Sequence, residues 1–540
     1  MRPILLSGYA AKSCARAVHN AWDPTVPRPD VPVTPELQAL FDTGVDFETA
    51  VLDAWAALRL PGYVDLRDLD GDKRVHIGAT LGAMRAGAAI IVGGRLPDDH
   101  DGARAGKPDL LLHDGDRGYH PADIKAHHVL DRRYDNAPAA TLAAPAWRDA
   151  VPLSDGGARH REEDLLQLAH YWRMLQACGH QAAEPRGAIC GTDRPGDPLL
   201  VWYDLDSPAF RTFSRTGGVA TRSALERYDH EHGFRRRVAE VARQRRGEPG
   251  DPAPLVEPIG QDECASCRWA PVCVDTLPAG DLSAELRGAL GVREYLALRA
   301  AGVRTVADLA AGDPAALLAG PYGGEVGHLR TRAHRLRKAV TSARLARDGL
   351  VVRRRAGHDV PHADVEVDID VEWGTDDVVY LWGLLVTEDG VSTYTPFFDP
   401  AVTDEERLAR ACLDHLAAVA AGAAARGRSL LVFHYASPEP RHARRFPPLP
   451  AGPAHPDRWI DLLPLVRAAV DSRAGHGLKV IARHGPGVSW RDPDPGGLQS
   501  QQWHAAARDG DPDAARRLLD YNEDDVRATR AIREWLRVRE

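Results

Sequence analysis

Sulfur-containing residues and lysine are scarce in this sequence. The 540 residues include 7 Cys and 3 Met, and so few, unevenly placed cysteines exclude a disulfide framework. Clustered cysteines in a reducing compartment more often bind metal or do redox chemistry, so their spacing matters more than their number. Lysine is rare, at positions 12, 73, 107, 125, 338 and 479, although arginine is abundant, which makes each retained lysine a stronger candidate for a chemical role.

Long apolar runs and a secretory signal are also missing. No apolar run approaches the ~18 residues that a membrane span requires, and the first twenty residues lack an apolar core followed by a small-residue cleavage site. Hydrophobic residues make up 44% and charged residues 27% of the chain, as in soluble globular proteins. We therefore expect a soluble, cytoplasmic protein without a membrane partner.

The sequence has no excess of basic charge and no nucleotide-binding loop. The formal net charge is -9, whereas a nucleic-acid binder is expected to present a basic surface. Local basic patches remain possible at residues 235–237 and 353–355, where a solvated helix face is the competing interpretation. No G-x4-G-K-[ST] motif occurs, so any unwinding of nucleic acid must come from a partner protein.

The length suggests roughly three domains, at about 100 to 200 residues each. Helical and strand patterns alternate over residues 1–280 and again over 349–540, which favours an α/β fold in both. Residues 281–348 instead read as short helices with glycine turns. Within them, residues 300–309 resemble a helix-hairpin-helix, whose backbone amides can meet a phosphate; inter-domain spacing is the alternative.

Acidic residues and one lysine gather on a predicted strand pair, residues 108–113 and 118–126, flanked by helices over 47–60 and 161–179. Asp123 and Lys125 are two apart on a strand, so their side chains leave the same face. Asp109 lies at the mouth of the preceding strand and Glu48 on the earlier helix, where Asp46 is the alternative. Such carboxylates suit Mg²⁺, and the lysine could stabilise developing negative charge during phosphodiester hydrolysis.

The following helix adds Gln167 and Tyr171, which are four apart and share a face. The order of an acid on a helix, then P-D, D-x-K and Q-x3-Y, resembles the RecB-like branch of the PD-(D/E)XK nucleases. The resemblance implies a restriction-endonuclease-like core over residues 1–280. It also implies a metal held by three acids, a catalytic lysine, and a Gln and a Tyr near the DNA; these six residues are Glu48, Asp109, Asp123, Lys125, Gln167 and Tyr171.

Four cysteines have a spacing typical of a metal site. Cys264, Cys267 and Cys273 form C-x2-C-x5-C, and Cys14 stands alone near the beginning of the sequence. Thiolates suit Zn²⁺ or an iron–sulfur cluster. One distant cysteine with three close ones resembles the iron–sulfur staple of AddB-like nucleases, which implies a structural [4Fe–4S] cluster, with zinc as the alternative. Cys178, Cys190 and Cys412 are expected to be buried thiols.

A second set of acids lies on the predicted strand over residues 365–373. Five carboxylates recur at every second position from 364 to 372 and would share one face; a solvated edge strand is the alternative interpretation. Near the end of the sequence, Tyr521 and Asp525 form Y-x3-D on one face of a helix predicted over 514–539. Between these segments, Glu439 follows a hydrophobic strand, and Asp461 is its alternative.

A strand D-x-E, a later acid and a helical Y-x3-D resemble the DEDDy exonucleases of RNase-H-like fold. The resemblance implies two Mg²⁺ or Mn²⁺ ions held by four acids, with a tyrosine orienting the attacking water. Asp368 with Asp370 is an alternative register, and a degenerate nucleic-acid-binding domain is an alternative role. The residues carried over are Asp370, Glu372, Glu439, Asp525 and Tyr521. His434 and His484 are interpreted as structural residues.

The combined pattern predicts a metal-dependent nuclease, and an exonuclease in particular. Its expected substrate is single-stranded or end-containing DNA in repair, recombination or defence. DNA is favoured over RNA. Two other classes remain open: a non-catalytic iron–sulfur DNA-binding scaffold that serves a separately encoded helicase, and a zinc-stapled RNA-processing nuclease.

Overall fold

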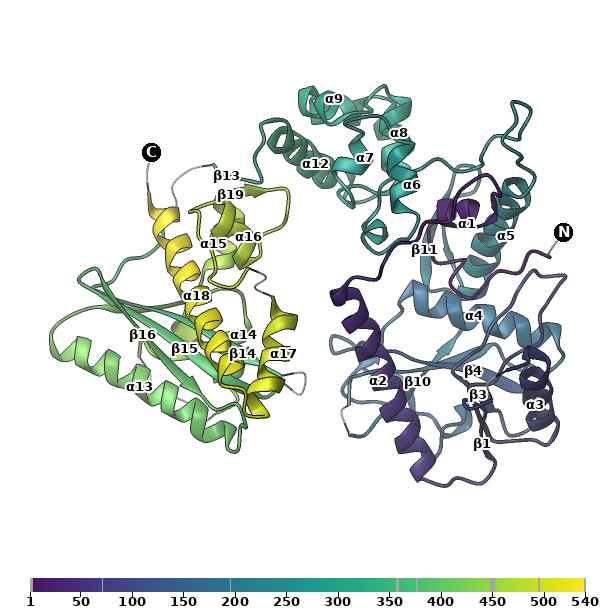
Figure 1. Cartoon of the computed structure of the whole chain (residues 1–540), viewed down its shortest axis with the longest axis horizontal. Coiled ribbons are helices and arrows are strands. Elements are labelled where there is room, and N and C mark those ends of the chain that lie inside the picture. Colours follow the sequence, from purple (N-terminus) through teal and green to yellow (C-terminus); the bar gives the residue numbers. More distant parts are fainter. Residues whose placement is uncertain are drawn as a thin grey trace. The chain divides into compact units, whose positions relative to one another are not determined.

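The computed structural model describes residues 3–69, 71–194, 196–355, 359–374, 377–446, 452–493 and 496–538. The chain forms two compact units, Met1–Ala279 and Gly280–Glu540, and each is described by itself. Figure 1 shows the chain and labels many of the elements used below.

The first unit is built on a mixed eight-stranded sheet with the strand order β1-β2-β3-β4-β9-β10-β6-β7. Two neighbouring pairs, β1–β2 and β4–β9, are parallel, whereas β3 and β4 form the antiparallel pair that the sequence predicts. The strands of this sheet are β1 (Tyr63–Asp65), β2 (Ile90–Val92), β3 (Leu110–His113), β4 (Tyr119–Ile124), β6 (Pro138–Thr141), β7 (Val151–Pro152), β9 (Arg186–Cys190) and β10 (Leu199–Asp204).

Helices cover both faces of this sheet. Leu110 and Leu112 of β3 pack against Trp55 of helix α2, whereas Leu111 between them packs on the opposite face against Met174 of helix α4. The alternation of side chains along a strand explains this division. The helices of the unit are α1 (Ala15–Trp22), α2 (Pro35–Ala57), α3 (Lys73–Arg85), α4 (Glu162–Ala177), α5 (Ala224–Ala242) and α6 (Ala270–Asp275).

The second unit begins with short helices and continues into a five-stranded sheet. Its helical part comprises α7 (Leu282–Glu285), α8 (Val292–Ala300), α9 (Val306–Ala311), α10 (Pro314–Ala319), α11 (Pro321–Glu325) and α12 (Arg332–Arg347). At the start of α9, the amides of Arg304 and Thr305 donate to Asp308, and the Asp308 amide donates to Thr305. These capping contacts already use amides that a phosphate would need.

The five-stranded sheet has the order β16-β15-β14-β17-β18, so β14 is its central strand. The first three strands are antiparallel, and β17 and β18 continue in parallel with β14. The strands are β14 (Val365–Trp373), β15 (Val379–Glu388), β16 (Val391–Phe398), β17 (Leu430–His434) and β18 (Ile460–Asp461), and β13 (Val352–Arg354) pairs with β19 (Val470–Ser472).

The two faces of β14 meet different helices (Figure 1). Its apolar residues, such as Val367 and Ile369, pack with Leu413 and Leu416 of helix α13, while its acidic side chains meet helix α18 on the other face. The acids are therefore on one face, as predicted, but of a central strand rather than a solvated edge. The helices are α13 (Glu405–Ala425), α14 (Pro438–Ala443), α15 (Leu462–Ala469), α16 (Leu478–His484), α17 (Gly497–Arg508) and α18 (Pro512–Arg537).

Helix α13 corrects one expectation about apolar segments. By length and composition it is apolar enough to cross a membrane, with a mean hydropathy of 1.3 over its most apolar window. Such a test is also passed by helices of soluble domains, and the buried residues Ala409, Cys412, Leu413 and Leu416 pack this helix against the sheet.

Candidate active sites

Three carboxylates from two elements converge in the second unit. Asp370 and Glu372 lie two residues apart on β14, and Asp525 lies on α18. One carboxylate oxygen from each lies within 4.8 Å of the other two. Glu372 and Asp525 are only 8% and 5% exposed. Oxygen ligands of this kind suit Mg²⁺ or Mn²⁺.

The electrostatics of these acids also fit a cation. Burial raises the pKa of Glu372 to about 8 and that of Asp525 to about 6. The pKa of Asp370 is raised well above its usual value by burial and then by the charges of Asp525 and Glu372. Buried like charges repel unless protons or a cation lie between them. The three residues could therefore hold a divalent metal ion.

Glu439 contributes a fourth charge to this neighbourhood. It lies near the beginning of α14, is 3% exposed, and its charge helps to raise the pKa of both Asp370 and Glu372. Its Oε2 lies 3.3 Å from Nδ1 of His434. The alternative acid, Asp461, is used differently, since its Oδ1 accepts the amides of Ala436 and Leu463 and caps α15.

Neighbouring polar groups orient the acids and the tyrosine. The indole nitrogen of Trp490 donates to Asp525 Oδ1 at 2.6 Å, and Nδ2 of Asn522 donates to Asp370 Oδ2 at 2.8 Å. Lys479 Nζ donates to the Tyr521 hydroxyl at 2.6 Å and also lies 4.4 Å from the centre of its ring. Side chains that hold a metal ligand in place typically affect metal affinity and activity.

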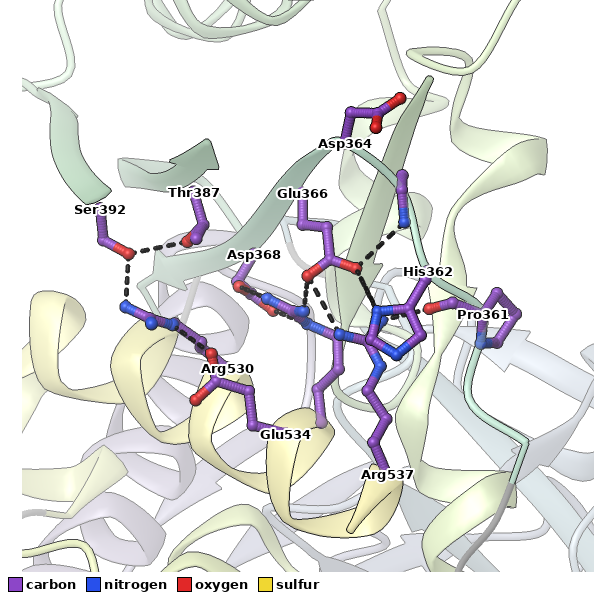
Figure 2. Close-up of polar contacts among 12 residues, drawn as sticks. Pro361, His362, Asp364, Glu366, Asp368, Thr387, Ser392, Arg530, Glu534 and Arg537 are labelled. Atoms are coloured by element: carbon purple, nitrogen blue, oxygen red, sulfur yellow. Dashed lines mark hydrogen bonds and ion pairs between the residues drawn. The ribbon is translucent and has the colours of Figure 1, made fainter. Parts of the chain in front are cut away.

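Two other acids of the row on β14 are neutralised by α18 (Figure 2). Asp368 accepts two hydrogen bonds from Arg533, and Glu366 pairs with both Arg533 and Arg537. The remaining member, Asp364, accepts from Ser429. This arrangement disfavours the alternative register with Asp368. Among the described residues, it leaves Asp370 and Glu372 as the acids within β14 that have no arginine partner.

The first unit brings together Asp109, Asp123 and Lys125 at one end of β3 and β4. Asp109 Oδ2 accepts the amide of Ile124 at 2.9 Å, and Asp123 forms an ion pair with Lys125. Asp123 is 1% exposed, and apart from this ion pair neither of its oxygens has a hydrogen-bond partner within the described part of the chain. Buried oxygens with so few partners fit a cation ligand.

The charges in this cluster act on one another. Burial, followed by the charge of Asp123, raises the pKa of Asp109 well above its usual value. Burial and Asp123 also raise the pKa of Glu48 on α2, whereas the alternative residue Asp46 is exposed. Burial alone would lower the pKa of Lys125, but Asp123 and Asp109 outweigh it and raise this pKa. The acids do not form a trio within 4.8 Å among the described residues, unlike the acids on β14 and α18.

Gln167 and Tyr171 reach this cluster from α4. Gln167 Oε1 accepts from Lys125 Nζ at 3.4 Å and from Lys12 Nζ at 2.8 Å. The Tyr171 hydroxyl donates to the Lys107 carbonyl at 3.2 Å. A Cβ at Gly106 would lie 2.6 Å from the Tyr171 ring, so glycine permits the close approach of this loop.

The four predicted cysteine ligands lie in one neighbourhood, although Cys14 is distant in sequence. The Cys14 amide donates to Glu263 Oε1 at 2.8 Å, across 249 residues. Gln261 donates through Nε2 to Cys14 Sγ and through its amide to Cys264 Sγ. Burial raises the pKa of the Cys14, Cys267 and Cys273 thiols, and charges of neighbouring thiols raise each of them further.

The other three cysteines are separate from this group. Cys190 in β9 and Cys412 in α13 are buried, as expected. Cys178 is only half-buried, because it ends α4, where its thiol contacts the Leu175 carbonyl.

Comparison with protein families identifies part of the chain. Residues 365–537 match a family model. The matched family is the RNase H superfamily. The match extends from β14 to α18 and thus includes Asp370, Glu372, Glu439, Tyr521 and Asp525, so the predicted RNase-H-like character of the C-terminal domain is confirmed. No curated protein and no solved structure matches the chain.

Several residues near the two sites were not singled out in the sequence. Lys12 and Lys479 are two of only six lysines, and this scarcity was the signal that could have found them. Asn522 directly follows the predicted Tyr521, whereas nothing in the local sequence marks Trp490. His434 was interpreted as structural, and its Nδ1 lies 3.3 Å from Oε2 of Glu439, the fourth acid of this site.

Proposed function

We propose that the protein is a metal-dependent nuclease whose C-terminal domain hydrolyses phosphodiester bonds. The observation that carries this proposal is the convergence of Asp370, Glu372 and Asp525 within a domain of the RNase H superfamily. When bound, Mg²⁺ or Mn²⁺ ions would polarise the phosphate and activate water. Glu439 would complete the set of four acids.

The chain's own residues would position the reactants. Tyr521 would orient the attacking water through its hydroxyl, which Lys479 holds by a 2.6 Å hydrogen bond. Trp490 and Asn522 would fix the rotamers of Asp525 and Asp370 by donating to one oxygen of each. The remaining oxygens of both carboxylates would then face the metal.

We infer a second nuclease site in the first unit, of the RecB-like kind. Glu48, Asp109 and Asp123 would hold one metal ion. The buried oxygens of Asp123, which pair with Lys125 but accept no hydrogen bond among the described residues, support this role. Lys125 would stabilise the negative charge that develops on the phosphate. Gln167, which bridges two lysines, and Tyr171 would lie beside the nucleic acid.

The cysteine group would act as a staple between the two ends of the first unit. Zinc–sulfur bonds of about 2.3 Å place the ligands of a tetrahedral zinc site about 3.8 Å apart. Among the described residues, no three of the four sulfur atoms form a group within 4.8 Å. The proposal of a [4Fe–4S] cluster in place of a single zinc ion rests on the sequence pattern of one distant and three close cysteines.

The proposed substrate is DNA, as single strands or ends, processed in repair, recombination or defence. A separately encoded helicase would supply any unwinding. The competing proposals are a non-catalytic DNA-binding scaffold and a zinc-stapled RNA-processing nuclease.

A nuclease assay with site-specific variants tests this proposal. The full chain is incubated with Mg²⁺ or Mn²⁺ and with single-stranded DNA, duplex DNA or RNA. Lys125→Ala should remove the activity of the first unit, and Asp370→Asn that of the C-terminal domain. Full activity in the double variant would refute both assignments, and binding without cleavage under any metal would favour the scaffold.

A further inference from the structure

The short segment 6–13, which precedes Cys14, lies against the candidate site of the first unit. The amide of Leu6 donates to Ala103, and the amide of Ala105 donates to Leu6. At the other end of the segment, Arg235 donates to the Ser13 carbonyl at 2.8 Å, and the neighbouring Cys14 contacts residues 261–263. Residues 8–13 are therefore held at both ends.

Lys12, within this segment, is a cation without a carboxylate partner. Its Nζ donates to Gln167 Oε1 at 2.8 Å, and the same oxygen accepts from Lys125 Nζ at 3.4 Å. Lys125 is neutralised by Asp123, whereas Lys12 forms no ion pair with any carboxylate in the described ranges. Burial and the charge of Lys125 lower the pKa of Lys12. An anion beside the two ammonium groups would relieve this repulsion.

Tyr9 presents an aromatic ring beside this cation. Tyr9 is 57% exposed, and Lys12 Nζ lies 4.4 Å from the centre of its ring. An exposed aromatic ring next to a cation is the combination with which proteins bind single-stranded nucleic acid, because a base stacks on the ring and the cation meets the backbone.

We propose that Tyr9 and Lys12 form a subsite for a single-stranded nucleotide, with a base stacked on Tyr9 and its phosphate bound by Lys12 together with Lys125. The subsite rests on the proposed function of the first unit. It adds that the nucleic acid reaches Asp109 and Asp123 as an unpaired strand. Stacking accepts any base, so the subsite should show little sequence preference.

Binding measurements without catalysis test the subsite. The full chain, its metal cluster intact, is titrated against fluorescent oligothymidylate with no added divalent cation. Tyr9→Ala should weaken binding about tenfold or more, while Tyr9→Phe should retain it. Lys12→Met should weaken binding and reduce the slope of log affinity against log salt by about 0.7, as expected for one lost phosphate contact to a single strand. Lys12→Arg should restore both.

Lys73→Met is the matched control, since it removes the same charge from the same unit but from a lysine already paired with Asp98. If Lys12→Met and Lys73→Met have the same salt slope, or if Tyr9→Ala binds as the parent does, the subsite is refuted. The outcome is separate from the nuclease proposal. If the protein has no nuclease activity but Lys12→Met weakens binding, the subsite is supported and the nuclease proposal is not. If the protein is an active nuclease and neither the Lys12 nor the Tyr9 variant changes binding, the subsite is excluded.

Discussion

Arg533 and Asp368 are both fully buried, with side-chain exposures of 0% each, and are joined by hydrogen bonds of 3.2 and 2.8 Å. Removing one partner of a buried ion pair leaves an uncompensated charge and costs about 3–5 kcal/mol. Arg533→Met should lower the free energy of unfolding of the second unit by this amount, because Asp368 has no other cation as close. Urea denaturation measures the difference.

The exposed pair Arg527–Glu523 on the same helix provides the control. Arg527→Met should cost at most about 1 kcal/mol. The double variant Arg533→Met with Asp368→Leu should recover much of the stability, because both charges are removed. Equal losses in the Arg533 and Arg527 single variants would contradict the importance of the buried pair.

Metal binding to the C-terminal site should become tighter as the pH rises. Burial raises the pKa of Glu372 from 4.5 to about 8 and that of Asp525 from 3.8 to about 6, so a metal ion must displace protons that these groups hold near neutrality. Mn²⁺ affinity should increase between pH 6 and pH 8.5, with proton release visible by calorimetry in buffers of different ionisation enthalpy. An affinity independent of pH would exclude these acids as ligands.

The same pKa values predict the stability of the metal-free domain. Between about pH 4 and pH 8 the folded state holds more protons on Glu372 and Asp525 than the unfolded state does, so stability falls as the pH rises through this range. Saturating Mn²⁺ should counter the decrease, because it replaces the protons between the carboxylates. Thermal denaturation with and without metal, compared with Asp370→Asn, measures this effect.

Trp490→Phe should weaken metal binding without unfolding the domain. Phenylalanine preserves an aromatic ring but removes the hydrogen bond to Asp525. Loss of a group that orients a metal ligand typically costs about 10- to 100-fold in affinity or activity. Trp503→Phe is the matched control, since Trp503 packs edge-on against Tyr521 and makes no recorded hydrogen bond to the acids. Equal metal affinities for the two variants would argue against a role for the indole.

Replacement of Cys14 should release the metal that we propose for the cysteine group. Anaerobically purified protein is expected to be brown and to contain iron, and Cys14→Ala should lose both the colour and the iron. Cys412→Ala, which alters a buried thiol in the other unit, should keep them. Zinc without iron in elemental analysis would favour the zinc alternative, and the absence of both metals would refute the site.

The sequence predicted the acid row of β14 but could not decide how its members are used. A period of two places all five carboxylates on one face, and only the packing of α18 shows that Arg533 and Arg537 neutralise two of them. The partners Trp490 and Lys479 come from segments far from β14 in sequence, and no local periodicity connects them to it. The roles of the individual acids therefore depend on tertiary packing, which the sequence pattern does not reveal.

One helix boundary could have been predicted from the sequence. The predicted helix over 47–60 begins instead at Pro35, with Thr34 accepting the Leu37 amide at 3.3 Å. A threonine followed by proline is a typical helix start, so this signal was overlooked. The overall apolarity of α13, in contrast, was underestimated because small alanine side chains form no conspicuous hydrophobic run.

The contact between Cys14 and the segment around Glu263 has a consequence for biosynthesis. The 249 residues that separate Cys14 from Glu263 take about 12 to 50 s to synthesise at roughly 5–20 residues per second. During that time the segment carrying Tyr9 and Lys12 lacks the anchor at Cys14. The nascent first unit therefore acquires its complete nucleotide subsite only after nearly all of that unit has left the ribosome.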